Sequence, residues 1–146
     1  MSQTSMQVRA ADGEPHTIVD GATDAVLRGC LALGLTGIAL IHLLDVFSKF
    51  KETPYLGWAD LALIAACLAI GSRIVHRGGA RWCLLAGLVA GATMVGYVLS
   101  RTTGLPGSGT DIGNWAEPLG VAALFVESVV LALSVYAYGL GRVHRS

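Results

Sequence analysis

Four long apolar runs constrain the fold of this chain more than any other feature of its sequence. They cover about residues 25–47, 57–76, 81–101 and 115–140 of the 146. Each run is close to the roughly 20 residues that an α-helix needs to cross the ~30 Å hydrocarbon layer of a bilayer. Because backbone groups inside lipid must be bonded within the protein, complete helices are favoured there. The sequence therefore predicts an all-α fold, a polytopic membrane bundle of four helices.

Composition and charge agree with this class of protein. Hydrophobic residues make up 53% of the chain, charged residues only 14%, and the mean hydropathy is +0.62. These values are more apolar than those of an ordinary soluble domain of this length. Ten basic residues balance ten acidic ones, so no basic face predicts binding to nucleic acid. The expected partners are the lipid bilayer and either other membrane subunits or further copies of the chain.

The ends of the chain and its basic residues predict an orientation. Residues 1–22 are polar without apolar periodicity, which is typical of a flexible tail, and residues 142–146 form a short basic tail. The membrane domain is then 23–141. Seven arginines fall on the side of the two tails and of the turn between the second and third runs, whereas three basic residues fall on the other side. This excess predicts a multi-pass protein of the bacterial cytoplasmic membrane with both termini in the cytoplasm.

Two stretches of the chain resemble each other and predict an internal repeat. Residues 57–66 read G-W-A-D-L-A-L-I-A-A, and residues 114–123 read N-W-A-E-P-L-G-V-A-A. Each stretch follows a short polar loop that contains a proline, Pro54 or Pro106. We therefore expect two tandem helix–loop–helix repeats, related by a pseudo-two-fold axis along the membrane normal.

Small residues indicate which helix faces pack closely. The third run contains Gly87 and Gly91, and then Ala92 and Gly96, each pair spaced by four residues. This spacing lets two helix backbones approach each other in lipid. The third helix is accordingly expected to use this face for helix–helix contact.

Ionisable residues inside the apolar runs are candidates for a functional site. His42 and Asp45 lie one helical turn apart near the end of the first run. An ionisable side chain at this depth is costly unless it is paired, and it rarely faces lipid. A nearby carboxylate is the usual partner that orients an imidazole for metal binding or proton transfer, so Asp45 is expected to orient His42. The alternative is that His42 makes only an interhelical hydrogen bond and Asp45 lies among the lipid headgroups.

The third and fourth runs add polar residues at a matching depth. Glu127 lies near the middle of the fourth run, on a face that must look into the bundle. Tyr97 and Arg101 share a face in the same outer half as His42. The favoured interpretation of Arg101 is that it extends to the headgroups. If it turns inward, the predicted ligand-binding site is an outward-facing polar pocket formed by His42, Asp45, Tyr97, Arg101 and Glu127. No catalytic residue is predicted.

Two further acids have a structural explanation. Asn114 and Glu117 have the spacing of a capping box, in which each side chain bonds a free backbone amide at the start of a helix. Gly57 and Asp60 repeat this spacing with a poorer cap. Acids in a first turn also suit the helix dipole. Asp60 and Glu117 are therefore expected to stabilise helix ends.

The sequence restricts the cofactors without naming one. Haem bound by two histidines needs both at one membrane depth, but His42 lies near the outer side and His76 near the inner end of the second run. A single chain is thus not expected to bind haem in this way, although a homodimer could use two copies of His42. His42 is also the best single candidate for a metal ligand, and a quinone remains possible. The three cysteines lie inside apolar runs and are expected to be packing residues.

Several short motifs resemble a group of small four-helix membrane proteins of actinobacteria and related bacteria. The motifs are I-H-L-L-D (41–45), P-Y-L-G-W (54–58), G-Y-V-L-S-R-T-T-G-L-P-G (96–107) and W-A-E-P-L-G (115–120). The similarity covers about residues 25–140 and implies the architecture. In size and layout the chain is also similar to the DoxX-like proteins, some of which are linked to quinone-coupled electron transfer. That second likeness is one of fold alone.

Three hypotheses of function follow from these observations. The first is a non-enzymatic binding protein or accessory subunit of a larger membrane assembly, such as a respiratory one. The second is a protein that binds a quinone or redox cofactor in the outward-facing pocket. The third is a small proton-coupled transporter or channel.

Overall fold

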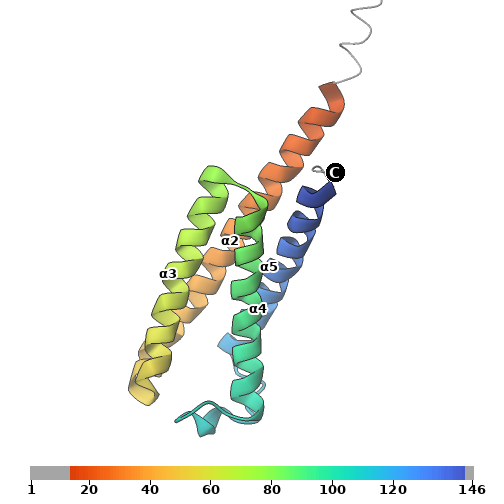
Figure 1. Cartoon of the computed structure of the whole chain (residues 1–146). Coiled ribbons are helices and arrows are strands. Elements are labelled where there is room, and N and C mark those ends of the chain that lie inside the picture. The colour runs from red at the N-terminus through yellow and green to blue at the C-terminus, as the bar shows by residue number, and fades with distance from the viewer. Residues whose placement is uncertain (1–13, 144–146) are drawn as a thin grey trace, which may run out of the picture.

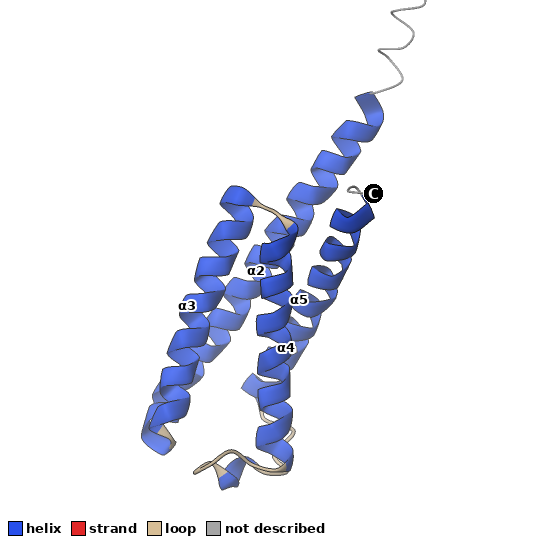
Figure 2. Cartoon of the chain, viewed as in Figure 1, coloured by secondary structure: helices blue, strands red, loops and turns tan. Residues whose placement is uncertain are grey.

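The computed structural model describes residues 14–143 and consists of long helices joined by short connections (Figures 1 and 2). The elements are α2 (Glu14–Glu52), α3 (Pro54–Arg77), α4 (Ala80–Thr102), the short 3-10 helix η1 (Gly109–Asp111) and α5 (Pro118–Val143). Successive long helices run in opposite directions, so the bundle has two distinct ends (Figure 1). We call the end with the α3–α4 turn the turn end. The opposite end, which carries residues 103–117, is the loop end.

Each long helix contains a segment that is long and apolar enough to cross a membrane. These segments are Gly21–Glu52, Pro54–Arg77, Ala80–Thr102 and Pro118–Leu140. Large apolar side chains cover the outside of the bundle: Leu33, Phe47 and Phe125 are 74%, 73% and 72% exposed. Such a surface is suited to lipid chains and not to water. The predicted all-α, four-helix membrane bundle is confirmed, and the chain is an integral, multi-pass membrane protein.

The core of the bundle is apolar toward the turn end. Leu31, Leu35 and Ile38 of α2 are fully buried there with Ile74 of α3 and Val130 of α5. α2 packs along both α3 and α5, and α4 packs along α5. Gly87 allows close contact between α4 and α5, because a Cβ at this position would lie 2.9 Å from the Cβ of Ser134. This closely packed part lies between the turn end and the polar residues of the loop end, and it holds the four helices together.

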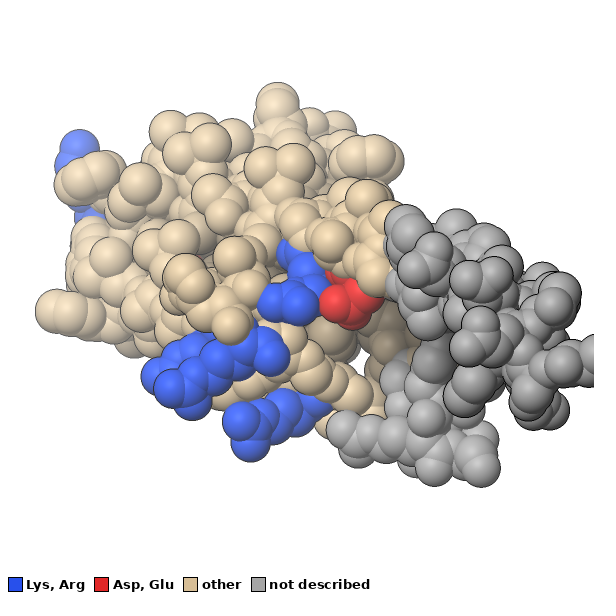
Figure 3. All heavy atoms as spheres, turned by 90° about the horizontal axis from the view of Figure 1, so that it is seen from above, with Lys and Arg blue, Asp and Glu red and all other residues tan. Residues whose placement is uncertain are grey.

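Basic side chains gather at the turn end, as seen from above in Figure 3. Arg28 donates hydrogen bonds to the carbonyls of Ile74 (2.9 Å) and Val75 (2.5 Å), and so bonds carbonyl groups in the last turn of α3. Gly78 follows with a φ of 61°, a left-handed conformation that favours glycine at the end of a helix. The chain then turns tightly into α4.

The helix ends differ from the sequence-based expectation at three places. The polar loop expected around Pro54 is almost entirely helical, because α2 continues to Glu52 and α3 already begins at Pro54. α2 begins at Glu14, so residues 14–22 of the predicted flexible tail are helical, while residues 1–13 and 144–146 lie outside the described residues. α5 begins at Pro118 instead of Trp115. Proline suits the first turn of a helix because it lacks the amide hydrogen that would remain unbonded there.

Both predicted capping boxes are wrong. Asn114 lies in the turns before α5, and the carbonyl of Glu117 accepts the bond from the Val121 amide. Asp60 lies inside α3, which already begins at Pro54. Glu117 directly precedes α5, but its side chain bonds Arg101, and the side chain of Asp60 lies at hydrogen-bond distance from His42. The predicted tandem repeat stays a prediction.

Candidate functional site

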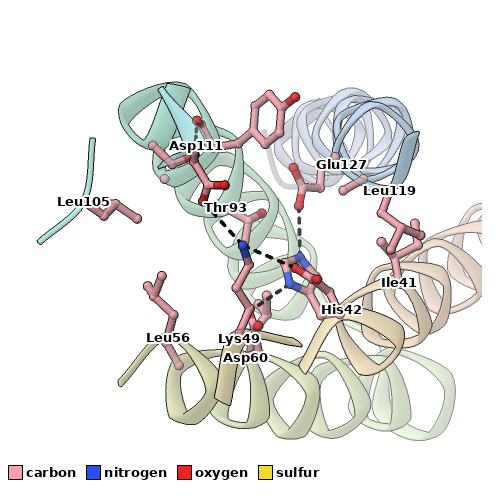
Figure 4. A pocket seen from close by; sticks show the side chains of 18 of the residues that line it. Ile41, His42, Lys49, Leu56, Asp60, Thr93, Leu105, Asp111, Leu119 and Glu127 are labelled. Atoms are coloured by element: carbon pink, nitrogen blue, oxygen red, sulfur yellow. Dashed lines mark hydrogen bonds and ion pairs between the residues drawn. The ribbon is translucent and has the colours of Figure 1, made fainter. Parts of the chain in front are cut away.

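A cavity of about 390 Å³ lies between the four long helices toward the loop end. Each helix contributes to its lining: His42 comes from α2, Asp60 from α3, Tyr97 from α4 and Glu127 from α5. Figure 4 shows His42 and Glu127 pointing toward each other across the cavity. All five residues of the predicted ligand site, His42, Asp45, Tyr97, Arg101 and Glu127, line this one cavity. Whether they bind a ligand stays a prediction.

Small residues explain why space remains between the helices here. Ala59 of α3, Ala92 and Gly96 of α4, and Gly120 and Ala123 of α5 all line the cavity. The small residues of α4 were expected to make helix contacts. In the structure Gly87 packs against α5, whereas Ala92 and Gly96 leave room for the cavity.

An imidazole between two carboxyl groups forms the inner cluster of the cavity (Figure 4). His42 Nδ1 lies 3.0 Å from Asp60 Oδ1, within hydrogen-bond distance. His42 Nε2 lies 3.6 Å from Glu127 Oε1, an ion-pair distance that is too long for a hydrogen bond. Glu127 is only 1% exposed, and both its Oε2 and His42 Nε2 are buried without a hydrogen-bond partner.

The partner that orients His42 is Asp60 and not Asp45. Asp45 lies 3.8 Å from Lys49 on the next turn of its own helix. His42 and Asp45 are three residues apart and therefore neighbours on α2. The imidazole of His42 nevertheless turns toward α3, where it lies within hydrogen-bond distance of Asp60. The prediction that Asp45 orients His42 is therefore wrong. Asp45 instead belongs to the charged groups at the mouth of the cavity.

Those charged groups form an outer cluster around Arg101. This arginine is 4% exposed, so the favoured prediction that it extends to the headgroups is wrong. Its Nη1 lies 3.1 Å from Asp111 Oδ1, and its Nη2 bonds the carboxyl group of Glu117. The guanidinium also lies over the Tyr97 ring, 4.8 Å from the ring centre. Two carboxylates and an aromatic ring thus hold the charge of Arg101 within the bundle.

The 103–117 loop folds over the outer cluster and joins it to α2 and α3. Lys49 Nζ of α2 lies 3.4 Å from Asp111 Oδ2. Tyr55 of α3 donates a 2.7 Å hydrogen bond to the carbonyl of Pro106. Within the loop, Ser108 Oγ donates to Asp111 at 2.8 Å. Asp111 thus connects three segments of the chain at the loop end.

The electrostatic environment of Asp111 favours its charged form. Burial raises the pKa of this carboxyl group, but the hydrogen bond from Ser108 and the positive charges of Lys49 and Arg101 outweigh the burial. The pKa of Asp111 therefore lies below its ordinary value of 3.8. Asp111 remains ionised and keeps its ion pairs over the whole neutral range.

Sequence reasoning missed four charged residues of the site: Lys49, Asp60, Asp111 and Glu117. A partial signal for Asp60 existed, because His42 lies ten residues before the end of α2 and Asp60 lies six residues after the start of α3, and Thr53 joins these two antiparallel helices. At 1.5 Å per residue the two depths differ by only about 6 Å, which side chains can span. No pattern singled out Asp111, since a glycine-rich loop does not reveal where its one acid will lie.

The structure gives no support for a metal centre of several ligands within the described residues. In residues 14–143 no group of three or more His, Cys, Asp and Glu side chains is arranged to hold a metal ion. His76 lies in the last turn of α3 at the turn end, far along the helix from the cluster of His42. The two histidines of the apolar runs are thus not placed to share a haem within one chain.

Comparison of the chain with protein-family models, with curated proteins and with solved structures finds no match. The class of protein is therefore defined here by its fold and its cavity. The protein is an integral membrane four-helix bundle with a cavity, lined by apolar and charged side chains, between its helices toward the loop end. The resemblance to actinobacterial four-helix proteins and to the DoxX-like layout stays a prediction.

Proposed function

We propose that this protein binds a small lipid-soluble molecule whose polar end enters the cavity, and that quinones with their quinol forms are the class it binds. The observation that carries the proposal is the pair of unbonded atoms at the inner cluster. His42 Nε2 and Glu127 Oε2 are buried without partners in a cavity that has room for a ligand. Leaving a buried polar group unbonded costs about 1–3 kcal/mol, which a ligand hydroxyl could recover because it both donates and accepts.

The walls of the cavity support a ligand of mixed character. Ile41, Leu63, Val89 and Leu119 provide apolar surface, while the inner cluster and the outer cluster provide polar groups at two levels. A quinone is a flat apolar ring with oxygens at opposite edges, and it dissolves in lipid. The volume of about 390 Å³ lies within the range of about 300–1,000 Å³ that is typical of small-molecule sites.

The first test is native mass spectrometry of the protein, gently extracted from its own membrane. A bound mass equal to that of a quinone supports the proposal and identifies the ligand. A bound haem or metal ion, or a ligand-free protein under conditions that retain lipids, would contradict it. Binding of a short-chain naphthoquinone is then measured in lipid nanodiscs. His42→Ala is expected to weaken binding while remaining inserted and helical, and unchanged binding in both His42→Ala and Glu127→Gln would refute the role of the cavity.

The same mass spectrum bears on the other two hypotheses. Stoichiometric protein partners would favour an accessory subunit of a larger membrane assembly, with the ligand held for that assembly. Recovery of a free monomer counts against this role. A proton-coupled transporter instead requires flux into liposomes that Glu127→Gln removes. Neither role is needed for the proposed binding, which depends on the cavity alone.

A further inference from the structure

We infer that the cavity selects ligands that donate hydrogen bonds, and that it therefore holds the reduced quinol in preference to the oxidised quinone. This inference rests on the proposed function. A quinol carries two hydroxyl groups that donate, whereas the carbonyl oxygens of a quinone only accept. The two forms have almost the same shape, so the donors and acceptors of the lining decide between them.

The hydroxyl groups of the lining are already used as donors within the protein. Thr93 Oγ1 donates to the carbonyl of Ala90 at 2.8 Å. Ser100 Oγ donates to the carbonyl of Tyr97 at 2.7 Å, and the Tyr97 hydroxyl donates to the carbonyl of Trp115 at 3.2 Å. Each hydroxyl has one hydrogen to donate, so none of the three is free to donate to a quinone carbonyl.

The cationic donors are directed at carboxyl groups of the outer cluster. Lys49 Nζ faces Asp111 and Asp45, and the two terminal nitrogens of Arg101 face Asp111 and Glu117. The Nε of Arg101 is buried without a partner. It lies one residue from the end of α4, at the level of the outer cluster and away from the inner cluster.

The inner cluster presents an acceptor. His42 Nδ1 bonds Asp60, and His42 Nε2 faces Glu127 Oε1. The imidazole lies beside the first oxygen of Glu127, Oε1, and leaves the second oxygen, Oε2, open to the cavity as an acceptor. That oxygen has no partner in the protein and is buried. A ligand hydroxyl can donate to it, whereas a quinone carbonyl would bring a second acceptor against it.

The charges of the lining point in the same direction. Its carboxyl groups belong to Asp45, Asp60, Asp111, Glu117 and Glu127, and they face two permanent cations, Lys49 and Arg101, together with His42. An excess of carboxyl oxygens repels the partial negative charge of a carbonyl and attracts the hydrogen of a hydroxyl. A hydrogen bond to a charged group, made by one form and not by the other, changes affinity by about 10- to 100-fold.

The test compares three ligands of nearly equal shape on the full-length protein in nanodiscs under anaerobic conditions. They are naphthohydroquinone, its dimethyl ether, which cannot donate, and naphthoquinone. We expect the hydroquinone to bind at least about tenfold more tightly than the other two. Equal or tighter binding of naphthoquinone would overturn the inference and leave the proposed function standing. Failure of all three to bind would overturn the proposed function itself.

Two further measurements sharpen this test. Glu127→Gln replaces the acceptor oxygens by an amide of the same size, so the preference for the hydroquinone should fall toward equality. Glu52→Gln, at the exposed end of α2, is the matched control and should keep the preference. If Glu127→Gln fails to insert, the comparison of hydroquinone with its ether on the unaltered protein still decides. Tighter binding of naphthylmethylammonium than of the hydroquinone would also overturn the inference, because the cavity would then select an amine cation.

Discussion

At the scale of single residues, the site depends on partners that come from other helices. His42 is one turn from Asp45 in sequence, yet it bonds Asp60 on α3 and faces Glu127 on α5. The position of Arg101 near the end of an apolar run predicts that it extends to the headgroups, yet it is buried and forms ion pairs with Asp111 and Glu117. The sequence shows which residues are ionisable and at what depth. It does not show helix rotation, which decides the partner of each side chain.

Loss of the buried guanidinium should strongly destabilise the protein. Arg101→Ala leaves the carboxyl groups of Asp111 and Glu117 without their shared cation, which typically costs about 3–5 kcal/mol for a buried pair. We expect a clearly lower Tm for thermal unfolding in detergent, followed by circular dichroism. Lys51→Ala removes an exposed cation at the same end of the bundle and should change stability by less than about 0.5 kcal/mol. Equal losses in the two variants would contradict the described role of Arg101.

Asp111 should make the loop end sensitive to acid. Its pKa is below the ordinary value of 3.8 in the folded protein, so its contribution to stability is fully present above about pH 4. As the pH falls through the lowered pKa, the carboxyl group becomes protonated and this contribution is lost. We expect the Trp115 fluorescence to report opening of the loop end below pH 4. Asp111→Asn should weaken this pH dependence, whereas Asp24→Asn at the turn end should leave it unchanged.

At the scale of helices, glycine and alanine have two different uses. Gly87 brings α4 close to α5, as its spacing predicted, while Gly96 and Gly120 line the cavity. A pattern of small residues predicts a helix face without bulky side chains. Such a face can lie against a neighbouring backbone or can border a cavity. The existence, order and approximate length of the four helices could be predicted because apolar length is a local property. The cavity could not be predicted, because it depends on how the small-residue faces of different helices are turned toward each other.

A matched pair of glycine variants tests this distinction. A Cβ at Gly120 would contact the Tyr97 ring, which packs against Arg101, whereas a Cβ at Gly91 meets nothing within 4 Å. Gly91→Ala should stabilise α4 by roughly 0.5–1 kcal/mol through its higher helix propensity. Gly120→Ala should show no such gain and should weaken naphthoquinone binding by displacing Tyr97. Similar gains in Tm and unchanged binding in both variants would contradict the close contact.

At the scale of the whole molecule, the surface separates into an apolar belt and two polar ends. The belt fits lipid, and the basic turn end in Figure 3 supports the proposal that this end faces the cytoplasm. The cavity at the loop end would then open toward the outer side of the membrane.

The orientation has a direct test. A phosphatase reporter, active only outside the cytoplasm, is expected to be inactive when fused after Ser146 and active when inserted after Gly107 in the loop. A green fluorescent reporter, which folds in the cytoplasm, should give the reverse pattern at the two sites. Phosphatase activity after Ser146 would show that the proposed orientation is inverted.

The buried carboxyl group of Glu127 has a consequence for biosynthesis. Among the described helices α5 follows α2, α3 and α4 in the chain, and an acid near the middle of a span costs about 2.5–3.5 kcal/mol on scales of membrane insertion. The side chain that lies closest to compensating this cost is His42 of α2, which precedes α5 in the chain. The inner cluster is therefore complete only once α5 has inserted beside α2.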